Sequence, residues 1–206
     1  MLKEESMTIR ALPESDATKS DNSFLLQYFE DFRSAVSPSD QVISDLILAK
    51  QKLVDASHSN KKIIVLGNGG SAAIASHFSV DLTKNAGIRS INFNEADLLT
   101  CFSNDFGYQE AYAKAVEFYG DPGDILIAIS SSGKSSNIIK SIQKARDGKF
   151  SAVLTFSGME NDNPLKQLGD INFWVDSFAY NLIENTHQVW LLSIVDLIIG
   201  KSVYSA

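Results

Sequence analysis

The sequence predicts an α/β fold, a three-layer α-β-α sandwich in which a five-stranded parallel sheet lies between two layers of helices. Two observations lead to this prediction. Short apolar, β-branched runs alternate along the chain with longer segments of helical periodicity. Two of these apolar runs end abruptly in turns that are rich in glycine or serine. Strands that are separated by helices pair in parallel, and the helices then cover both faces of the sheet.

The N-terminal part is predicted to be a helical hairpin that follows a polar tail. Residues 1–22 are polar and charged, contain Pro13 and show little periodicity, which is typical of a mobile tail. Apolar residues from Phe24 to Phe32 have helical spacing, and Ser37-Pro38-Ser39-Asp40 is typical of a second helix start, with Pro38 in the first turn. We therefore expect one folded domain over residues 23–206. A helical hairpin needs a surface to pack against, for which a partner subunit is a natural candidate.

The remaining elements alternate between strand and helix. Strands are expected at residues 63–66, 90–93, 125–129, 152–156 and 172–175. Helices are expected at residues 72–85, 95–102, 108–119, 135–146, 164–168 and 182–202, with a loop at residues 103–107. Ligands of parallel sheets bind at the carboxyl ends of the strands, and both unusual turns are expected there.

Composition narrows the class of protein. The chain has 206 residues and a formal net charge of −7, which argues against broad electrostatic binding of nucleic acid or of an anionic membrane. The single cysteine, Cys101, excludes an internal disulfide and is expected to be a buried structural thiol. With no apolar segment near the N-terminus, a cytoplasmic location is expected. The apolar stretch from Val189 to Ile199 is too short to span a bilayer, which needs about 20 residues.

The first unusual turn, Gly67-Asn68-Gly69-Gly70-Ser71, separates a buried strand from a helix and is called the glycine loop below. A strand, a glycine turn and a helix start together present backbone N–H groups and the positive end of a helix dipole to an anion. The glycines allow positive φ and close approach of a ligand. Ser71 can cap the helix or donate its hydroxyl. The alternative is an ordinary turn between a strand and a helix.

The second turn, Ser130-Ser131-Ser132-Gly133-Lys134-Ser135-Ser136-Asn137, repeats this pattern and is called the serine loop below. Five serine hydroxyls converge on the start of one helix. A solvated linker is the alternative, but it fits poorly between a buried strand and an apolar helix. The spacing does not match a P-loop, and the chain has no GxGxxG motif, so no nucleotide cofactor is expected. Hydroxyls and neutral amides favour a single phosphate monoester on a small molecule.

Four titratable side chains form two pairs with helical spacing. His77 and Asp81 are four residues apart in the helix after the glycine loop, and Glu184 and His187 are three residues apart in the last helix. The members of each pair share a helix face. Carboxylates and imidazoles are common metal ligands, so these residues are candidates for a metal site. The alternative is that they are ordinary core or solvated helix residues.

Three motifs together resemble the SIS (sugar isomerase) domain, most closely that of the phosphoheptose isomerases. They are Gly67-Asn68-Gly69-Gly70-Ser71-Ala72-Ala73 with His77-Phe78, then Asn104-Asp105-Phe106-Gly107-Tyr108, and Ile129-Ser130-Ser131-Ser132-Gly133-Lys134-Ser135. The resemblance runs in order from about Phe24 to the end of the chain. It implies a five-stranded parallel sheet between helices and a homotetramer with active sites at subunit interfaces.

The resemblance also assigns the substrate site. It implies that the serine loop holds the phosphate of a sugar phosphate, that the glycine loop faces the sugar, and that one aspartate lies at the pocket edge. The implied substrate-binding residues are Asn68, Gly69, Gly70, Ser71, Asp105, Ser130, Ser131, Ser132 and Ser135.

The implied activity is the aldose–ketose isomerisation of sedoheptulose 7-phosphate, which supplies heptose precursors for surface lipopolysaccharide. Such a reaction moves a proton between adjacent carbons through an enediol, and needs a base, an acid and a group that stabilises the enediolate. A divalent metal can provide the last of these. The candidate catalytic residues are Asp81, Glu184 and His187, and the candidate ligands of a zinc ion are His77, Asp81 and Glu184.

The chain departs from the family pattern at four positions. Asp81 replaces a glutamate, Glu184 replaces a glutamine that ligates the metal, and Lys134 replaces an asparagine. Leu192 replaces a second histidine, which is both a metal ligand and an acid–base group in the family. Leucine neither binds a metal nor carries a proton.

Three interpretations follow from these departures. The first is a diverged isomerase in which Glu184 or Asp81 is the base and His187 or His77 the acid. The second is a non-catalytic module that binds phosphosugars and acts through a protein partner. The third is an enzyme for a different phosphosugar. We favour the isomerase, because both loops and a set of carboxylate and imidazole groups are present.

Overall fold

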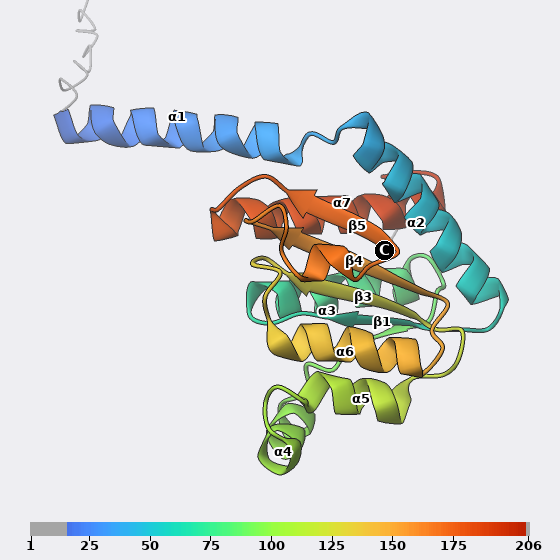
Figure 1. Cartoon of the computed structure of the whole chain (residues 1–206). Coiled ribbons are helices and arrows are strands. Elements are labelled where there is room, and N and C mark those ends of the chain that lie inside the picture. Colours follow the sequence, from blue (N-terminus) through green and yellow to red (C-terminus); the bar gives the residue numbers. More distant parts are fainter. Residues whose placement is uncertain (1–15, 205–206) are drawn as a thin grey trace, which may run out of the picture. The chain divides into compact units, whose positions relative to one another are not determined.

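A computed structural model describes residues 16–204 and divides the chain into two units, one up to Ser34 and one from Ala35 on (Figure 1). Most of α1 (Asp16–Val36) forms the first unit. Of the tail predicted at residues 1–22, residues 1–15 lie outside the described part, whereas residues 16–22 form the first turns of α1. The helix begins earlier than predicted because polar residues also have adequate helix propensity, although they leave no apolar periodicity.

The second unit contains a sheet of five parallel strands, which confirms the predicted fold class. The strands are β1 (Ile63–Leu66), β2 (Ser90–Ile91), β3 (Ile125–Ser130), β4 (Ala152–Gly158) and β5 (Ile171–Val175), in the spatial order β2-β1-β3-β4-β5. Every neighbouring pair is parallel. The central strands β1 and β3 are therefore neighbours, and both carry a polar loop at their carboxyl ends.

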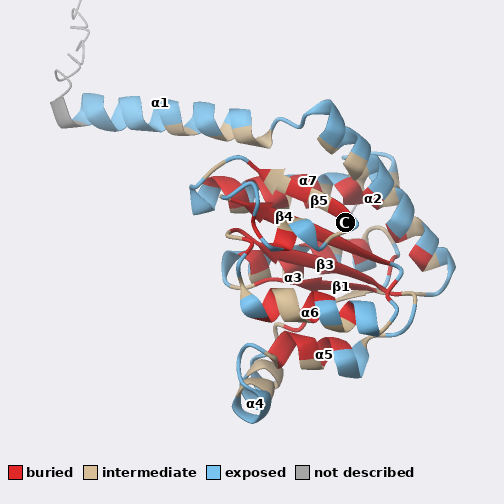
Figure 2. Cartoon of the chain, viewed as in Figure 1, coloured by how far each residue is buried: buried red, intermediate tan, exposed pale blue. Residues whose placement is uncertain are grey.

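Helices cover both faces of this sheet. On one face, α2 (Asp40–His58), α3 (Gly70–Lys84) and α7 (Tyr180–Ile199) contribute to one apolar core, and on the other face α5 (Ala111–Tyr119) and α6 (Ser136–Asp147) contribute to a second. The strand residues alternate between the two cores: Ile63 and Val65 belong to the first, and Ile64 and Leu66 to the second. Figure 2 shows the resulting buried sheet between helices whose outer faces are exposed.

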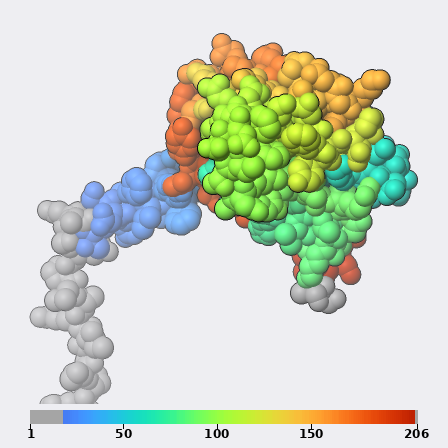
Figure 3. All heavy atoms as spheres, turned by 90° about the horizontal axis from the view of Figure 1, so that it is seen from below, coloured from blue at the N-terminus to red at the C-terminus, as the bar shows by residue number. Residues whose placement is uncertain are grey.

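Two local predictions were wrong in α4 (Ala96–Phe106). The helix continues through residues 103–106, which were predicted as loop, and ends at Gly107, whose φ of 85° stops it. Cys101 is exposed on this helix, not buried. The polar residues at positions 103–105 resemble a loop, which explains the first error, and α4 buries no residue completely, which explains the second. The α4–α5 region, green in Figure 3, forms part of the surface in that view.

The start of α2 also differs from the prediction. Ser39 is the N-cap, and its Oγ accepts a hydrogen bond from the backbone N–H of Val42. Pro38 therefore precedes the cap and does not lie in the first turn. After β4, a short 3₁₀ helix, η1 (Leu165–Gln167), lies within the range where a short helix was predicted.

Among the described residues one helix, α7, is long and apolar enough to cross a membrane by length and composition alone. Its side chains Ile183, Leu191 and Ile194 are buried in the core that they share with the sheet. The helix also packs on α2 and α3. In this structure α7 is thus a core helix of the second unit.

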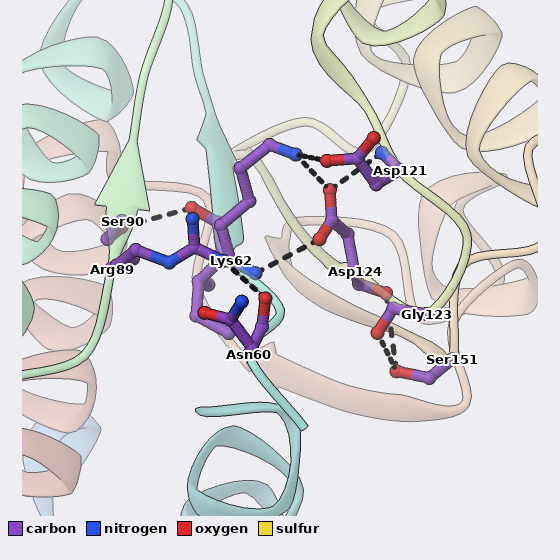
Figure 4. Close-up of polar contacts among 9 residues, drawn as sticks. Asn60, Lys62, Arg89, Ser90, Asp121, Gly123, Asp124 and Ser151 are labelled. Atoms are coloured by element: carbon purple, nitrogen blue, oxygen red, sulfur yellow. Dashed lines mark hydrogen bonds and ion pairs between the residues drawn. The ribbon is translucent and has the colours of Figure 1, made fainter. Parts of the chain in front are cut away.

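A buried carboxylate joins β1 and β3 at their amino ends (Figure 4). Asp124 is 1% exposed, and its Oδ1 accepts a hydrogen bond of 3.0 Å from the backbone N–H of Lys62. Its Oδ2 accepts a hydrogen bond from the backbone N–H of Asp121 and lies 2.6 Å from the Nζ of Lys62. Burial alone would lower the pKa of Lys62, but the carboxylates of Asp121 and Asp124 outweigh it and raise that pKa. This clamp helps to fix the register of β1 against β3.

Replacing Lys62 by methionine should destabilise the fold, because the buried carboxylate of Asp124 then loses its cation. We expect the free energy of unfolding to fall by about 2 kcal/mol, less than for a fully buried pair since the ammonium group is partly in water. Urea denaturation measures this difference. Lys61→Met, the matched control next in the chain, should change stability by less than about 0.5 kcal/mol. Equal stabilities of the two variants would contradict the clamp.

Candidate functional site

The glycine and serine loops are held together by a pair of asparagine side chains. Because β1 and β3 pair in parallel, their following loops meet at the same edge of the sheet. The Nδ2 of Asn68 donates to Oδ1 of Asn137, and the Nδ2 of Asn137 donates to Oδ1 of Asn68, each over 2.9 Å. The hydroxyl of Tyr108 donates to the same Oδ1 of Asn68 over 2.9 Å. Asn68 therefore connects the two loops, and its predicted contact with the sugar stays a prediction.

Asn137 is the last residue of the serine loop, and the sequence predicted no separate role for it. It is 2% exposed, and its Oδ1 also accepts a hydrogen bond from the backbone N–H of Ile138. Asn137 lies in the first turn of α6, after the N-cap Ser135, so a capping pattern does not identify its role. Its hydrogen bonds with Asn68 depend on the pairing of β1 with β3, which the sequence alone does not show.

The serine loop brings several hydroxyl groups together at the start of α6. The Oγ atoms of Ser130 and Ser135 are 2.9 Å apart, and Gly133 has a φ of +65°. Ser135 is the N-cap of α6, but its side chain makes no capping hydrogen bond, and its hydroxyl is instead hydrogen-bonded to that of Ser130. The Oγ of Ser132 accepts a hydrogen bond of 3.3 Å from the backbone N–H of Lys134. Hydroxyls and the start of α6 thus lie in one short segment.

A second buried asparagine, Asn163, supports the serine loop from the segment that follows β4. Its Nδ2 donates to the Oγ of Ser157 and to the backbone oxygens of Gly158 and Glu160. A Cβ at Gly133 would lie 2.0 Å from the Oδ1 of Asn163, so only glycine fits at that position. Sequence reasoning missed Asn163, because its role depends on this contact between distant segments.

Glu184 is the predicted acid–base residue that reaches both loops. A Cβ at Gly70 would lie 2.2 Å from its Oε2, so the carboxylate lies directly against the glycine loop. The Oγ of Ser131 donates a hydrogen bond to its Oε1 over 3.5 Å. The carboxylate is half-buried and lies beside the N-terminus of α3, whose positive end favours a negative charge.

The other predicted pair, His77 and Asp81, lies on the α3 surface toward α7. The Nε2 of His77 is 3.5 Å from the Oδ2 of Asp81, and its Nδ1 is 3.2 Å from the Nε2 of Gln188. The Oδ1 of Asp81 accepts a hydrogen bond of 3.1 Å from Asn85. Gln188, which was not singled out in the sequence, therefore takes one nitrogen of this imidazole.

His187 lies in the core. Its side chain is fully buried, its Nε2 is 3.0 Å from the backbone oxygen of Ser157, and its ring packs edge-on against Phe156. Burial lowers its pKa to about 4, although the hydrogen bond with Ser157 acts in the opposite direction. The ring is therefore neutral at pH 7. A buried neutral imidazole does not fit the predicted acid–base role at a sugar.

Two further predictions concern the metal and Asp105. Within residues 16–204, no three histidine, cysteine, aspartate or glutamate side chains are grouped so that they could hold a metal ion. Asp105 is exposed on α4, where its carboxylate accepts hydrogen bonds from Asn104 and Cys101. Its place at the edge of a sugar pocket stays a prediction.

The glycine loop itself borders a cavity of about 340 Å³, which Asn68, Asn94 and Tyr108 help to line.

Comparison with known families defines the class of this protein. The family model described as SIS domain matches residues 27–153, which is more than half of the chain. The match includes the glycine loop and the serine loop. The paired loops at the carboxyl edge of a parallel sheet are thus those of an SIS domain.

Curated relatives narrow this class. The chain is 35% identical over 155 residues to the phosphoheptose isomerase of Hamiltonella defensa, covering 72% of this chain and 74% of the relative. It is 34% identical over 152 residues to the phosphoheptose isomerase of Helicobacter pylori, covering 71% and 78%. The chain therefore belongs to the phosphoheptose isomerase family.

Solved structures have the same fold. A phosphoheptose isomerase from Francisella tularensis superposes with a TM-score of 0.78 at 24% identity, covering 91% of this chain and all of that one. The phosphoheptose isomerase GmhA from Neisseria gonorrhoeae also gives 0.78, at 23% identity over 88% and 99% of the two chains. These similarities support the assignment of the fold.

The low pKa of His187 predicts an acid-sensitive stability. The unfolded chain binds a proton at this histidine near pH 6.5, whereas the folded chain binds it only near pH 4, so stability is lost as pH falls through this window. We expect the free energy of unfolding to drop by about 2 kcal/mol from pH 7 to pH 4.5 on account of this group. Urea denaturation at both pH values measures it. His187→Gln should show a drop smaller by this amount, and an unchanged drop would contradict the burial of a neutral ring.

Proposed function

We propose that this chain is an aldose–ketose isomerase of phosphorylated sugars, with sedoheptulose 7-phosphate as substrate. The observation that carries the proposal is the position of Glu184, whose carboxylate lies against the glycine loop and accepts a hydrogen bond from the serine loop. A base so placed is next to a phosphate seat and within hydrogen-bond distance of its lining. The named activity of the relatives supports this choice.

The serine loop supplies the phosphate seat in this proposal. The hydroxyls of Ser130, Ser132 and Ser135, with the free backbone N–H groups at the start of α6, take the phosphate oxygens. Ser131 assists and also orients Glu184. Lys134 is exposed at the same loop and forms no ion pair with a described residue, so it adds positive charge beside the phosphate.

The glycine loop and Glu184 then handle the other end of the sugar. Glu184 removes a proton from carbon 1 of the ketose, and the electron pair forms a double bond between carbons 1 and 2 while the carbonyl oxygen gains charge. Hydrogen-bond donors of the two loops stabilise that enediolate. Return of the proton from Glu184 to carbon 2, with transfer of the hydroxyl proton from the oxygen on carbon 1 to the oxygen on carbon 2, gives the aldose phosphate and restores the carboxylate.

The resemblance also implies a zinc ion, but the residues present do not fit one. Of the proposed ligands, His77 and Asp81 contact one another and Glu184 contacts the loops, while the position of the second histidine is Leu192. The proton transfer proposed above therefore uses only groups of the protein. Asp81 remains next to His77 as a second candidate acid–base group.

The non-catalytic alternative is not favoured, because the curated relatives are isomerases and the candidate base is in place. A different phosphosugar remains the second candidate substrate. The sequence departs from the family at Lys134, in the serine loop, and at Asp81, on α3. A panel of sugar phosphates that differ in chain length decides between the two substrates.

We infer that the chain is a cytoplasmic homotetramer whose sites lie at subunit interfaces and that it supplies heptose precursors for lipopolysaccharide. Exposed apolar side chains support assembly, among them Phe24, Leu26 and Phe29 of α1. Gly69 and Gly70 are also exposed, so a second copy could complete the sugar pocket. Light scattering measures the mass in solution, and a mass near the 22.5 kDa of one chain would contradict the tetramer.

Two substitutions separate binding from chemistry. Glu184→Gln keeps the shape of the side chain but removes the base, so kcat for sedoheptulose 7-phosphate should fall by about 10²–10⁴-fold with little change in binding. Ser135→Ala removes a phosphate contact and should weaken binding by roughly 10- to 150-fold, since a hydrogen bond to a charged group contributes roughly 1.5–3 kcal/mol. Product analysis gives kcat, and calorimetry gives the affinity.

Glu160→Gln is the matched control, because Glu160 is an exposed carboxylate in the segment between β4 and η1. Its kcat and affinity should equal those of the unmodified chain. Turnover of Glu184→Gln at the unmodified rate would contradict the assigned base. Binding without turnover by the unmodified chain would favour the non-catalytic alternative.

A further inference from the structure

We infer that this chain isomerises its substrate without a bound divalent metal, using the carboxylate of Glu184 directly. The inference rests on the proposed isomerase function and concerns its mechanism. The family pattern implies a metal held between α3 and α7, but the side chains that this chain presents there do not match such a site.

On α7, one implied metal ligand is missing. Glu184, Gln188 and Leu192 are spaced four residues apart, so they follow one another along one face of the helix. The position that would provide a second imidazole therefore presents an aliphatic side chain. A zinc site needs three or four protein ligands, and leucine removes one of them.

On α3, both ring nitrogens of His77 lie near polar side chains of this chain. The Nε2 of Gln188 is an amide nitrogen, which only donates, so Nδ1 of His77 accepts this hydrogen bond and the ring proton is on Nε2. The Nε2 faces the carboxylate of Asp81 at 3.5 Å. A metal at Nδ1 needs the lone pair that this hydrogen bond uses, so Gln188 competes with a metal for this nitrogen.

The other histidines of the chain are the possible replacements for the missing imidazole ligand. The chain has only three histidines, His58, His77 and His187. His187 is fully buried, with its Nε2 at the backbone oxygen of Ser157. His58 is in the last turn of α2, whose C-terminus is at the amino edge of the sheet, opposite the loops. Neither imidazole can replace the missing ligand beside Glu184.

The contacts of Glu184 fit a direct role. With glutamate in place of the glutamine of the family pattern, this position changes from a neutral ligand to a base that can take a proton. Gly70 leaves the room that its carboxylate fills, and Ser131 donates to the same group. The replacement of glutamine by Glu184 therefore brings a proton carrier to both loops.

Zinc binding and metal-free turnover test the inference on the intact chain. Isothermal calorimetry titrates zinc into chelator-treated protein, and isomerase activity is measured before and after chelation. We expect no stoichiometric binding of zinc with micromolar or tighter affinity, and unchanged turnover. Leu192→His with Gln188→Ala restores an imidazole and frees Nδ1 of His77, so it should bind zinc at least tenfold more tightly.

The matched control is Val189→His, which places a histidine on an exposed part of the same helix. It should not bind zinc more tightly than the unmodified chain. Turnover that disappears on chelation and returns with zinc would overturn the inference while leaving the isomerase function intact. Absence of turnover under both conditions would overturn the isomerase function itself, and with it the inference. Stoichiometric zinc binding that is lost in His77→Ala would overturn the metal-free site independently of activity.

Discussion

The pairing of β1 with β3 is the constraint on which the site depends. These strands are far apart in the sequence, but their parallel register brings the glycine loop and the serine loop to one edge of the sheet. Asp124 holds this register at the amino ends through the backbone and side chain of Lys62. Asn68 and Asn137 hold the loops at the carboxyl ends. The two strands are thus fixed at both ends, and the loops between which a sugar phosphate is proposed to bind are positioned by the sheet.

Two glycines allow the loops to receive their supporting side chains. Gly70 leaves space for the carboxylate of Glu184, and Gly133 leaves space for the amide of Asn163. In each case a Cβ would lie 2.2 Å or less from an oxygen of the other residue, far inside van der Waals contact. Gly133 has a positive φ whereas Gly70 does not, but both lack a side chain, which lets α7 and the segment after β4 approach the loops. This links the catalytic proposal for Glu184 to backbone positions that carry no side chain.

The sequence predicted the sheet, both loops and the SIS domain family, because strong local patterns mark them: β-branched runs, glycine and serine turns, and a family motif. It failed where a residue's role is set by contacts between distant segments. His187 has the same helical spacing whether it faces a ligand or the core, and only packing puts it against Phe156. Asn163 and Gln188 lie in segments with no motif, yet they contact the serine loop and His77. Helix α4 was cut short because polar residues at its end resemble a loop.

One sugar phosphate is proposed to contact the serine loop and Glu184 at the same time. A crystal structure of the chain with sedoheptulose 7-phosphate bound is the direct test. We expect the phosphate at Ser130, Ser132 and Ser135, carbons 1 and 2 close enough to Glu184 for direct proton transfer, and no metal between the sugar and His77. A phosphate bound elsewhere, or a Glu184 carboxylate more than about 8 Å from those carbons, would contradict the proposed site, since proton transfer requires hydrogen-bond distances.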